Sequence, residues 1–192
     1  VTDAAFSSGI FTVSGDLTLN GKLVHGKKPV VIGAFKPATT EGGLVLNKIH
    51  FAGKVNETTT LSNLIDIDAA AVLTKITLTD NDIEAYSARL ISGSGESKCG
   101  PVLIRGNRVS NFGVSGDFID FRKGTVGSIK VVSNTFENGI RTFLRCDAAV
   151  ICTAINVENN TFYNLGSVDN KDNNGILHVR STTATATPRQ IV

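Results

Sequence analysis

The stretch ITLTDNDI at residues 76–83 sets the pattern for most of the chain. Two apolar residues lie two positions apart, an Asn follows three positions after the second, and another apolar residue lies two positions beyond the Asn. The pattern recurs as VLIRGNRV at 102–109, IKVVSNTF at 129–136 and INVENNTF at 155–162, with the Asn residues 26, 27 and 26 positions apart. A repeat of this length with alternating apolar residues predicts an all-β fold, a right-handed parallel β-helix of about six coils.

A second strand is expected in each coil after the Asn-bearing turn, because apolar residues alternate there again with a period of two. These second strands are 64–68, 89–92, 118–122, 143–146 and 176–180. Upstream, LTLN at 17–20 and LVLN at 44–47 repeat at 27 residues, with the Asn two places earlier relative to the strand. Residues 1–43 are therefore expected to hold earlier coils with a different turn.

The repeated Asn residues are interpreted as structural. Asn tolerates left-handed backbone conformations, its side chain bonds nearby backbone groups, and stacked amides can form a ladder from coil to coil. A second Asn register follows four residues later, at Asn111, Asn138 and Asn164. The three cysteines are too few for a complete disulfide framework, and Cys146 and Cys152 are expected to be small apolar residues on strands.

The composition favours a single domain over residues 1–192. With 19 basic and 17 acidic residues interspersed, the net charge is +2, so neither nucleic acid nor an anionic membrane is expected as a partner on electrostatic grounds, and any anionic ligand would need a local basic patch. No apolar run approaches the roughly 20 residues of a membrane-spanning helix. The chain has no Met, which fits either a processed secreted protein or a fragment. The final PRQIV at 188–192 is similar to the beginning of another first strand, so more coils or a cap are expected to follow.

Two insertions, at 53–62 and 167–175, lengthen their coils at turns, where loops often line a binding face. Side-chain parity also places polar residues on the outside of the second strands. One outward row is predicted to hold Asp66, Ser92, Asp120, Arg145 and His178, and a second row Arg122, Asp147 and Arg180. These rows fit either a solvated face with cross-coil ion pairs or a groove for an extended carbohydrate.

The run DFIDFRKG at 117–124, followed by VVSNTFEN at 131–138 and TFLRCD at 142–147, resembles the chondroitinase B and alginate lyase family of parallel β-helix polysaccharide lyases. It is similar also to chondroitinase-B-like domains of surface lipoproteins from Bacteroides-type bacteria. The resemblance implies Lys123 as a catalytic base, Arg145 as the acid of a β-elimination, and a calcium ion held by Asp117 and Asp120. The chain departs from the family pattern, because Cys146 and Asp147 follow Arg145 where the family has His-Gly.

Three functional hypotheses follow. The first is a secreted or outer-surface protein that binds polysaccharide along its second-strand face, with Asp120, Arg122, His178 and Arg180 as binding residues. The second is a uronate-polysaccharide lyase that uses Lys123 and Arg145 with calcium. The third is a structural or adhesive surface module that binds no glycan. Fold similarity alone does not decide among them.

Overall fold

The structure is a computed structural model that describes residues 9–38, 41–93, 95–112, 117–139, 143–165, 177–179 and 190–191, the last two segments by their backbone. The described residues contain strands and no helix. The strands are β1 (Gly9–Val13), β2 (Leu17–Asn20), β3 (Val30–Pro37), β4 (Gly42–Asn47), β5 (His50–Ala52), β6 (Asn63–Asp66), β7 (Val72–Thr79), β8 (Asp82–Glu84), β9 (Arg89–Gly93), β10 (Lys98–Cys99), β11 (Val102–Arg105), β12 (Arg108–Ser110), β13 (Ile119–Val132), β14 (Thr135–Gly139), β15 (Leu144–Glu158), β16 (Thr161–Leu165), β17 (Leu177–Val179) and β18 (Gln190–Ile191).

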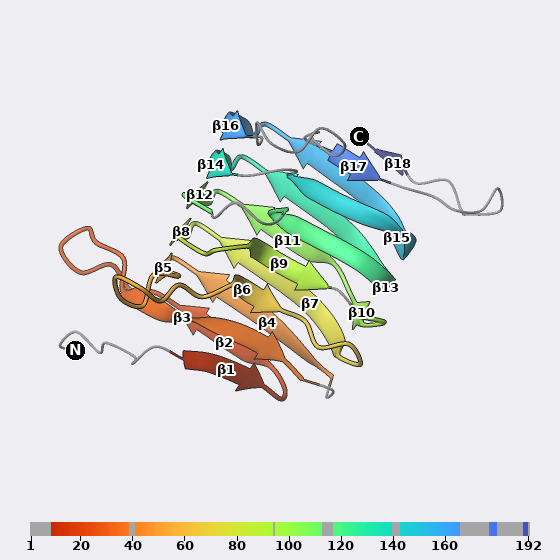
Figure 1. Cartoon of the computed structure of the whole chain (residues 1–192), viewed down its shortest axis with the longest axis horizontal. Coiled ribbons are helices and arrows are strands. Elements are labelled where there is room, and N and C mark those ends of the chain that lie inside the picture. The colour runs from red at the N-terminus through yellow and green to blue at the C-terminus, as the bar shows by residue number, and fades with distance from the viewer. Residues whose placement is uncertain are drawn as a thin grey trace.

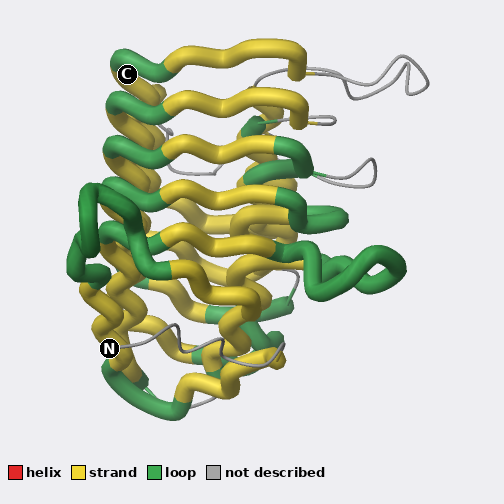
Figure 2. The backbone as a smooth tube through the Cα atoms, turned by 90° about the vertical axis from the view of Figure 1, so that its left-hand side faces the viewer, coloured by secondary structure: helices red, strands yellow, loops and turns green. Residues whose placement is uncertain are grey.

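These strands stack as a parallel β-solenoid of about six turns (Figure 1 and Figure 2). The first strands form one side of the stack, with β4, β7, β11 and the later halves of β13 and β15 paired in parallel. The second strands β6, β9 and the earlier halves of β13 and β15 form another side. All strand pairs of this solenoid are parallel, as the repeat predicts.

The register follows the sequence repeat residue by residue. Ile76 pairs with Val102, Val102 with Ile129, and Ile129 with Ile155. Upstream, Leu17 pairs with Leu44, so the described part of residues 1–43 forms an earlier coil, as expected. At the other end β18 pairs in parallel with β15, which confirms that the final segment adopts a first-strand position.

Each coil has one more strand than the two predicted. The short strands β5, β8, β12, β14 and β16 follow the Asn-bearing turn and form a third side of the stack. The sharp bends before β8, β12, β14 and β16 arise one residue earlier than expected, because Asp80, Gly106, Ser133 and Asn159 carry the positive φ angles; Lys48 does so before β5. The ladder Asn itself is not left-handed. The residues of the second Asn register are left-handed, with φ between 51° and 56°.

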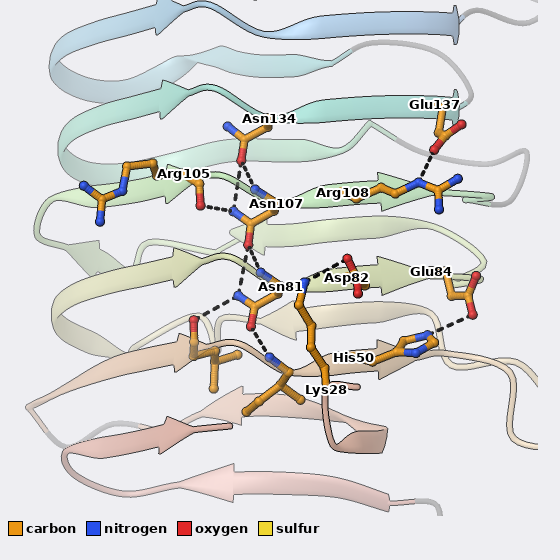
Figure 3. Close-up of polar contacts among 12 residues, drawn as sticks. Lys28, His50, Asn81, Asp82, Glu84, Arg105, Asn107, Arg108, Asn134 and Glu137 are labelled. Carbon is orange, nitrogen blue, oxygen red and sulfur yellow. Dashed lines mark hydrogen bonds and ion pairs between the residues drawn. The ribbon is translucent and has the colours of Figure 1, made fainter. Parts of the chain in front are cut away.

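The inner Asn register forms a continuous buried ladder (Figure 3). The Oδ1 atoms of Asn107, Asn134 and Asn160 each accept two hydrogen bonds from the Asn of the preceding coil, one from its backbone N–H and one from its Nδ2, at 2.8–3.0 Å. At the start of the ladder, the Oδ1 of Asn81 accepts from the backbone N–H of Ile49 at 3.0 Å. Each Nδ2 also donates to a carbonyl of the coil before, as from Asn107 to Leu78 at 2.9 Å. The amide thereby satisfies backbone groups that the bend removes from the sheets. The outer register is an exposed ladder through Asn111, Asn138 and Asn164.

The core is a column of apolar side chains inside the coils. One row runs through Phe51, Ile83, Val109, Phe136 and Phe162, which are partners on successive short strands. At the C-terminal end, the ring of Phe143 packs edge to face on Phe136, at 4.7 Å between centroids, and Phe136 stacks on Phe162 at 5.6 Å. Such pairs add to the stabilisation that comes from removing the rings from water. Cys146 and Cys152 are buried on β15, as expected for small apolar residues.

Candidate functional site

The outward row predicted for the second strands is present. Asp66 pairs with Ser92, Ser92 with Asp120, Asp120 with Arg145, and Arg145 with His178. His178 is described only by its backbone, and Arg180 and the insertion at 167–175 lie outside the described residues. On this face, the structure therefore describes the charged side chains between Arg89 and Asp147.

These side chains form an ion-pair cluster around Asp120. The Oδ2 of Asp120 accepts a hydrogen bond from Arg89 Nε and another from Arg122 Nε, both at 2.9 Å. Arg145 donates from Nη2 to Asp147 Oδ2 at 2.7 Å, and its Nη1 lies 3.7 Å from Asp117 Oδ2. Among the described residues, the cluster holds three arginines and three aspartates, whose formal charges sum to zero.

The cluster is less accessible than the solvated face that the sequence suggested. The side chain of Asp120 is 2% exposed and that of Arg145 is 18% exposed. Asp120 does point out of the apolar core, but the arginine stems of the neighbouring coils cover it. Arg122 has the most exposed side chain around Asp120, at 39%. A sugar approaching this face would meet Arg122 before Asp120.

The environment of Arg145 stabilises its protonated form. Burial acts to lower the pKa of this guanidinium, but the hydrogen bond to Asp147 and the charges of Asp120, Asp147 and Asp117 outweigh it, so the pKa is raised. A higher pKa makes Arg145 a weaker proton donor, which disfavours the acid role implied by the lyase resemblance.

The expected calcium ligands, Asp117 and Asp120, face arginine side chains. Calcium takes six to eight oxygen ligands, whereas the carboxylates of Asp117 and Asp120 face the guanidiniums of Arg145, Arg89 and Arg122. No cluster of three or more His, Cys, Asp or Glu residues suited to a metal occurs within the described ranges. The three arginines balance the charge of the three aspartates, so the described cluster has no net negative charge to attract a divalent cation.

Lys123 lies apart from Arg145 because β15 bulges by one residue opposite Arg122 of β13. Phe121 pairs with Cys146, but the next aligned pair is Lys123 with Ala149, three residues beyond Cys146. Gly124 follows with a φ of +87°, and a Cβ there would lie 2.1 Å from the carbonyl oxygen of Ser97. The turn that needs this glycine brings the exposed Lys123 to a corner of the stack, at the junction of a second strand with the following first strand.

An open groove runs along this corner and includes Lys123. One part of it has a volume of about 680 Å³ and the adjoining part about 330 Å³; Lys123, Lys98 and Glu96 line both. Its other lining residues come from four successive coils: Ala69, Ala70, Ala71, Val72, Gly95, Ser97, Gly124, Thr125, Ala149 and Ile151. The groove thus follows the long direction of the solenoid, and we call it the corner groove.

The corner groove is positively charged. Lys98 and Lys123 are exposed, and neither forms an ion pair with any carboxylate in the described part of the chain. Glu96 is the one acidic residue among the lining residues. The family resemblance indicated Lys123, whereas Lys98 was not among the predicted site residues. Lys98 comes just before Cys99, which pairs with Val126. This pairing places Lys98 beside Thr125, and it is the feature that could have indicated Lys98.

Comparisons with protein-family models, with curated proteins and with solved structures found no match for this chain. The structure bears out the parallel β-helix that the lyase resemblance implies. Among the described residues, no helix has the length and apolar character needed to cross a membrane.

Proposed function

We propose that this protein binds an acidic polysaccharide in the corner groove, outside the cell or on its outer surface. The observation that carries the proposal is the pair of exposed lysines, Lys98 and Lys123, which come from successive coils and line one groove without carboxylate partners. A polymer with a negative charge on its sugar rings would gain one ion pair at each of the two coils that carry these lysines. The stacked coils of a solenoid suit such an extended ligand.

The remaining lining supports a sugar ligand in particular. Ala70 and Ile151 provide apolar surface on either side of the lysines, and the side chain of Ile151 is 65% exposed. Binding sites for small polar ligands combine apolar walls with a few polar groups that fix orientation. The C–H faces of pyranose rings can pack on the apolar parts, while Thr125 offers a hydroxyl.

The lyase hypothesis has less support from the geometry. Lys123 and Arg145 come from adjacent strands, but Arg145 is engaged with three aspartates and Lys123 aligns with Ala149. Incubation with alginate or chondroitin sulfate, with and without calcium, tests this hypothesis through the ultraviolet absorbance of an unsaturated product. We expect binding without that product. A product that forms with the wild type and is lost in Lys123→Ala would establish the lyase instead.

Binding is tested by titrating the whole chain with alginate, chondroitin sulfate and neutral dextran. We expect the two acidic polymers to bind, dextran not to bind, and the affinity to fall with added salt. The double variant Lys98→Ser/Lys123→Ser should bind about tenfold more weakly or worse. The matched control Lys75→Ser/Lys130→Ser changes two exposed lysines outside the groove and should bind like the wild type.

Two results would overturn the proposal. The first is an equal loss of affinity in the groove variant and in the control, which would indicate a general charge effect. The second is no binding to any acidic polymer, which would favour the structural or adhesive module.

A further inference from the structure

The loop between β2 and β3 carries an exposed apolar tip. Val24 and Lys27 exchange two backbone hydrogen bonds of 3.0 Å, so residues 21–30 fold back as a small hairpin. Its two turn residues, His25 and Gly26, have φ angles of +49° and +76°. Positive values at both positions are typical of a tight type I′ turn. We call residues 21–30 the β2–β3 hairpin; it projects from the stack on the side away from β10 (Figure 1).

Apolar and basic side chains are combined on this hairpin. Leu23 is 50% exposed, Val24 60% and Val30 51%, which makes them three of the six most exposed large apolar residues of the described chain. Lys22 and Lys27 are exposed and form no ion pair with a described residue. Lys28 is held at 2.9 Å by Asp82 (Figure 3). Residues 21–30 contain no Asp or Glu, so the tip has a net positive charge.

We propose that the β2–β3 hairpin inserts its tip into an anionic lipid surface. Leu23 and Val24 would enter the boundary between headgroups and acyl chains, and Lys22 and Lys27 would lie among the anionic headgroups. Apolar insertion and basic attraction together are the two contributions that hold proteins on membrane surfaces. The hairpin supplies the local basic patch that the balanced overall charge does not.

A lipid surface fits the hairpin better than a protein partner. A stable protein interface buries roughly 800 Å² on each partner, whereas this apolar surface consists of one projecting turn with three apolar side chains. A narrow convex tip can enter a fluid interface without a matching groove. The proposal is independent of polysaccharide binding, because the hairpin shares no residue with the corner groove.

Co-sedimentation of the purified chain with vesicles tests the proposal. We expect the chain to sediment with vesicles of equal parts phosphatidylcholine and phosphatidylglycerol, and to remain in solution with vesicles of phosphatidylcholine alone. The variant Leu23→Ser/Val24→Ser should lose about tenfold or more in partitioning, because the apolar gain is removed. Lys22→Gln/Lys27→Gln should lose about 25-fold, since each of the two lysines near an anionic surface contributes about fivefold.

Matched controls separate the hairpin from the rest of the surface. Ile10→Ser changes another exposed apolar residue, and Lys75→Ser/Lys130→Ser changes two exposed lysines outside the hairpin and the groove; both variants should sediment like the wild type. Circular dichroism verifies that each variant is folded.

The proposal is overturned if the wild type does not bind the anionic vesicles. It is overturned also if Leu23→Ser/Val24→Ser binds them undiminished, which would indicate adsorption by charge alone. A wild type that is dimeric in sedimentation, and monomeric only in Leu23→Ser/Val24→Ser, would assign the tip to a second copy of the chain instead.

Discussion

The Oδ1 of Asn107 accepts both the backbone N–H and the Nδ2 of Asn81, at 2.9 and 3.0 Å. All three groups are buried. We predict that Asn107→Ala lowers the free energy of unfolding by about 3 kcal/mol, because two donors of Asn81 and the carbonyl of Leu78 lose a partner. Urea unfolding measures the change.

The exposed ladder provides the control for this variant. Asn138→Gly removes one amide of the outer register while it keeps the left-handed backbone at that position. Its cost should stay below about 1 kcal/mol, since water replaces the lost partners. Equal losses in the free energy of unfolding for the two variants would show that the buried ladder stabilises the fold no more than the exposed one.

The cluster around Asp120 is expected to be stabilising as it stands and costly to break. Asp120→Asn removes the charge between Arg89 and Arg122 and should lower the free energy of unfolding by about 3 kcal/mol. Asp68→Asn, which breaks the exposed pair with Lys36 at 3.6 Å, should cost less than about 1 kcal/mol. An Asp120→Asn variant as stable as the wild type in urea would contradict this view of the cluster.

The ionisation of Cys99 is expected to lower the free energy of unfolding at alkaline pH. Burial raises the pKa of its thiol from 9.0 to about 12. Below pH 9 the thiol is protonated in both states. Between pH 9 and about pH 12 only the unfolded chain loses the thiol proton. The free energy of unfolding therefore falls with rising pH by up to about 1.4 kcal/mol per pH unit.

Variants at this position isolate that contribution. Cys99→Ala is expected to be less stable than the wild type at about pH 8, with a gap that narrows towards about pH 11 as the thiol's contribution is lost. The neighbouring cavity variant Val126→Ala carries no titratable change and should keep a constant gap. A constant gap for Cys99→Ala in urea unfolding would contradict the prediction.

Gly124 shapes the bend that presents Lys123. Gly124→Ala combines a left-handed backbone with a Cβ 2.1 Å from Ser97 O, and should cost more than about 2 kcal/mol. Gly26→Ala has the same left-handed strain but nothing within 4 Å, so its cost should be about 1 kcal/mol. Thermal unfolding compares the two, and a Gly26→Ala variant at least as destabilised as Gly124→Ala would refute the steric account.

The sequence repeat was enough to predict the solenoid, because the alternation around Asn81 and Asn107 fixes both the strands and their register. It did not reveal the short strand after each Asn, since the bend arises from the preceding residue, as at Ser133. The burial of Asp120 was not predicted. Side-chain alternation shows whether a residue points into or out of the core, but it does not show whether neighbouring side chains cover it.

The corner groove depends on features that the alternation of side chains along a strand does not predict. The bulge in β15 shifts the partner of Lys123 to Ala149, and Lys98 reaches the groove through a strand of only two residues. The β2–β3 hairpin was also missed, because no repeat pattern extends through its turn. These positions depend on departures from the repeat rather than on the repeat itself.

Protection from amide hydrogen exchange on addition of alginate tests the proposed function most directly. Binding in the corner groove predicts slower exchange at 95–98, 123–125 and 149–151, with no change at 21–30. The Lys98→Ser/Lys123→Ser variant should show no such protection under the same conditions. Protection confined to any other surface, or an unchanged exchange pattern in the wild type at saturating alginate, would contradict binding in this groove.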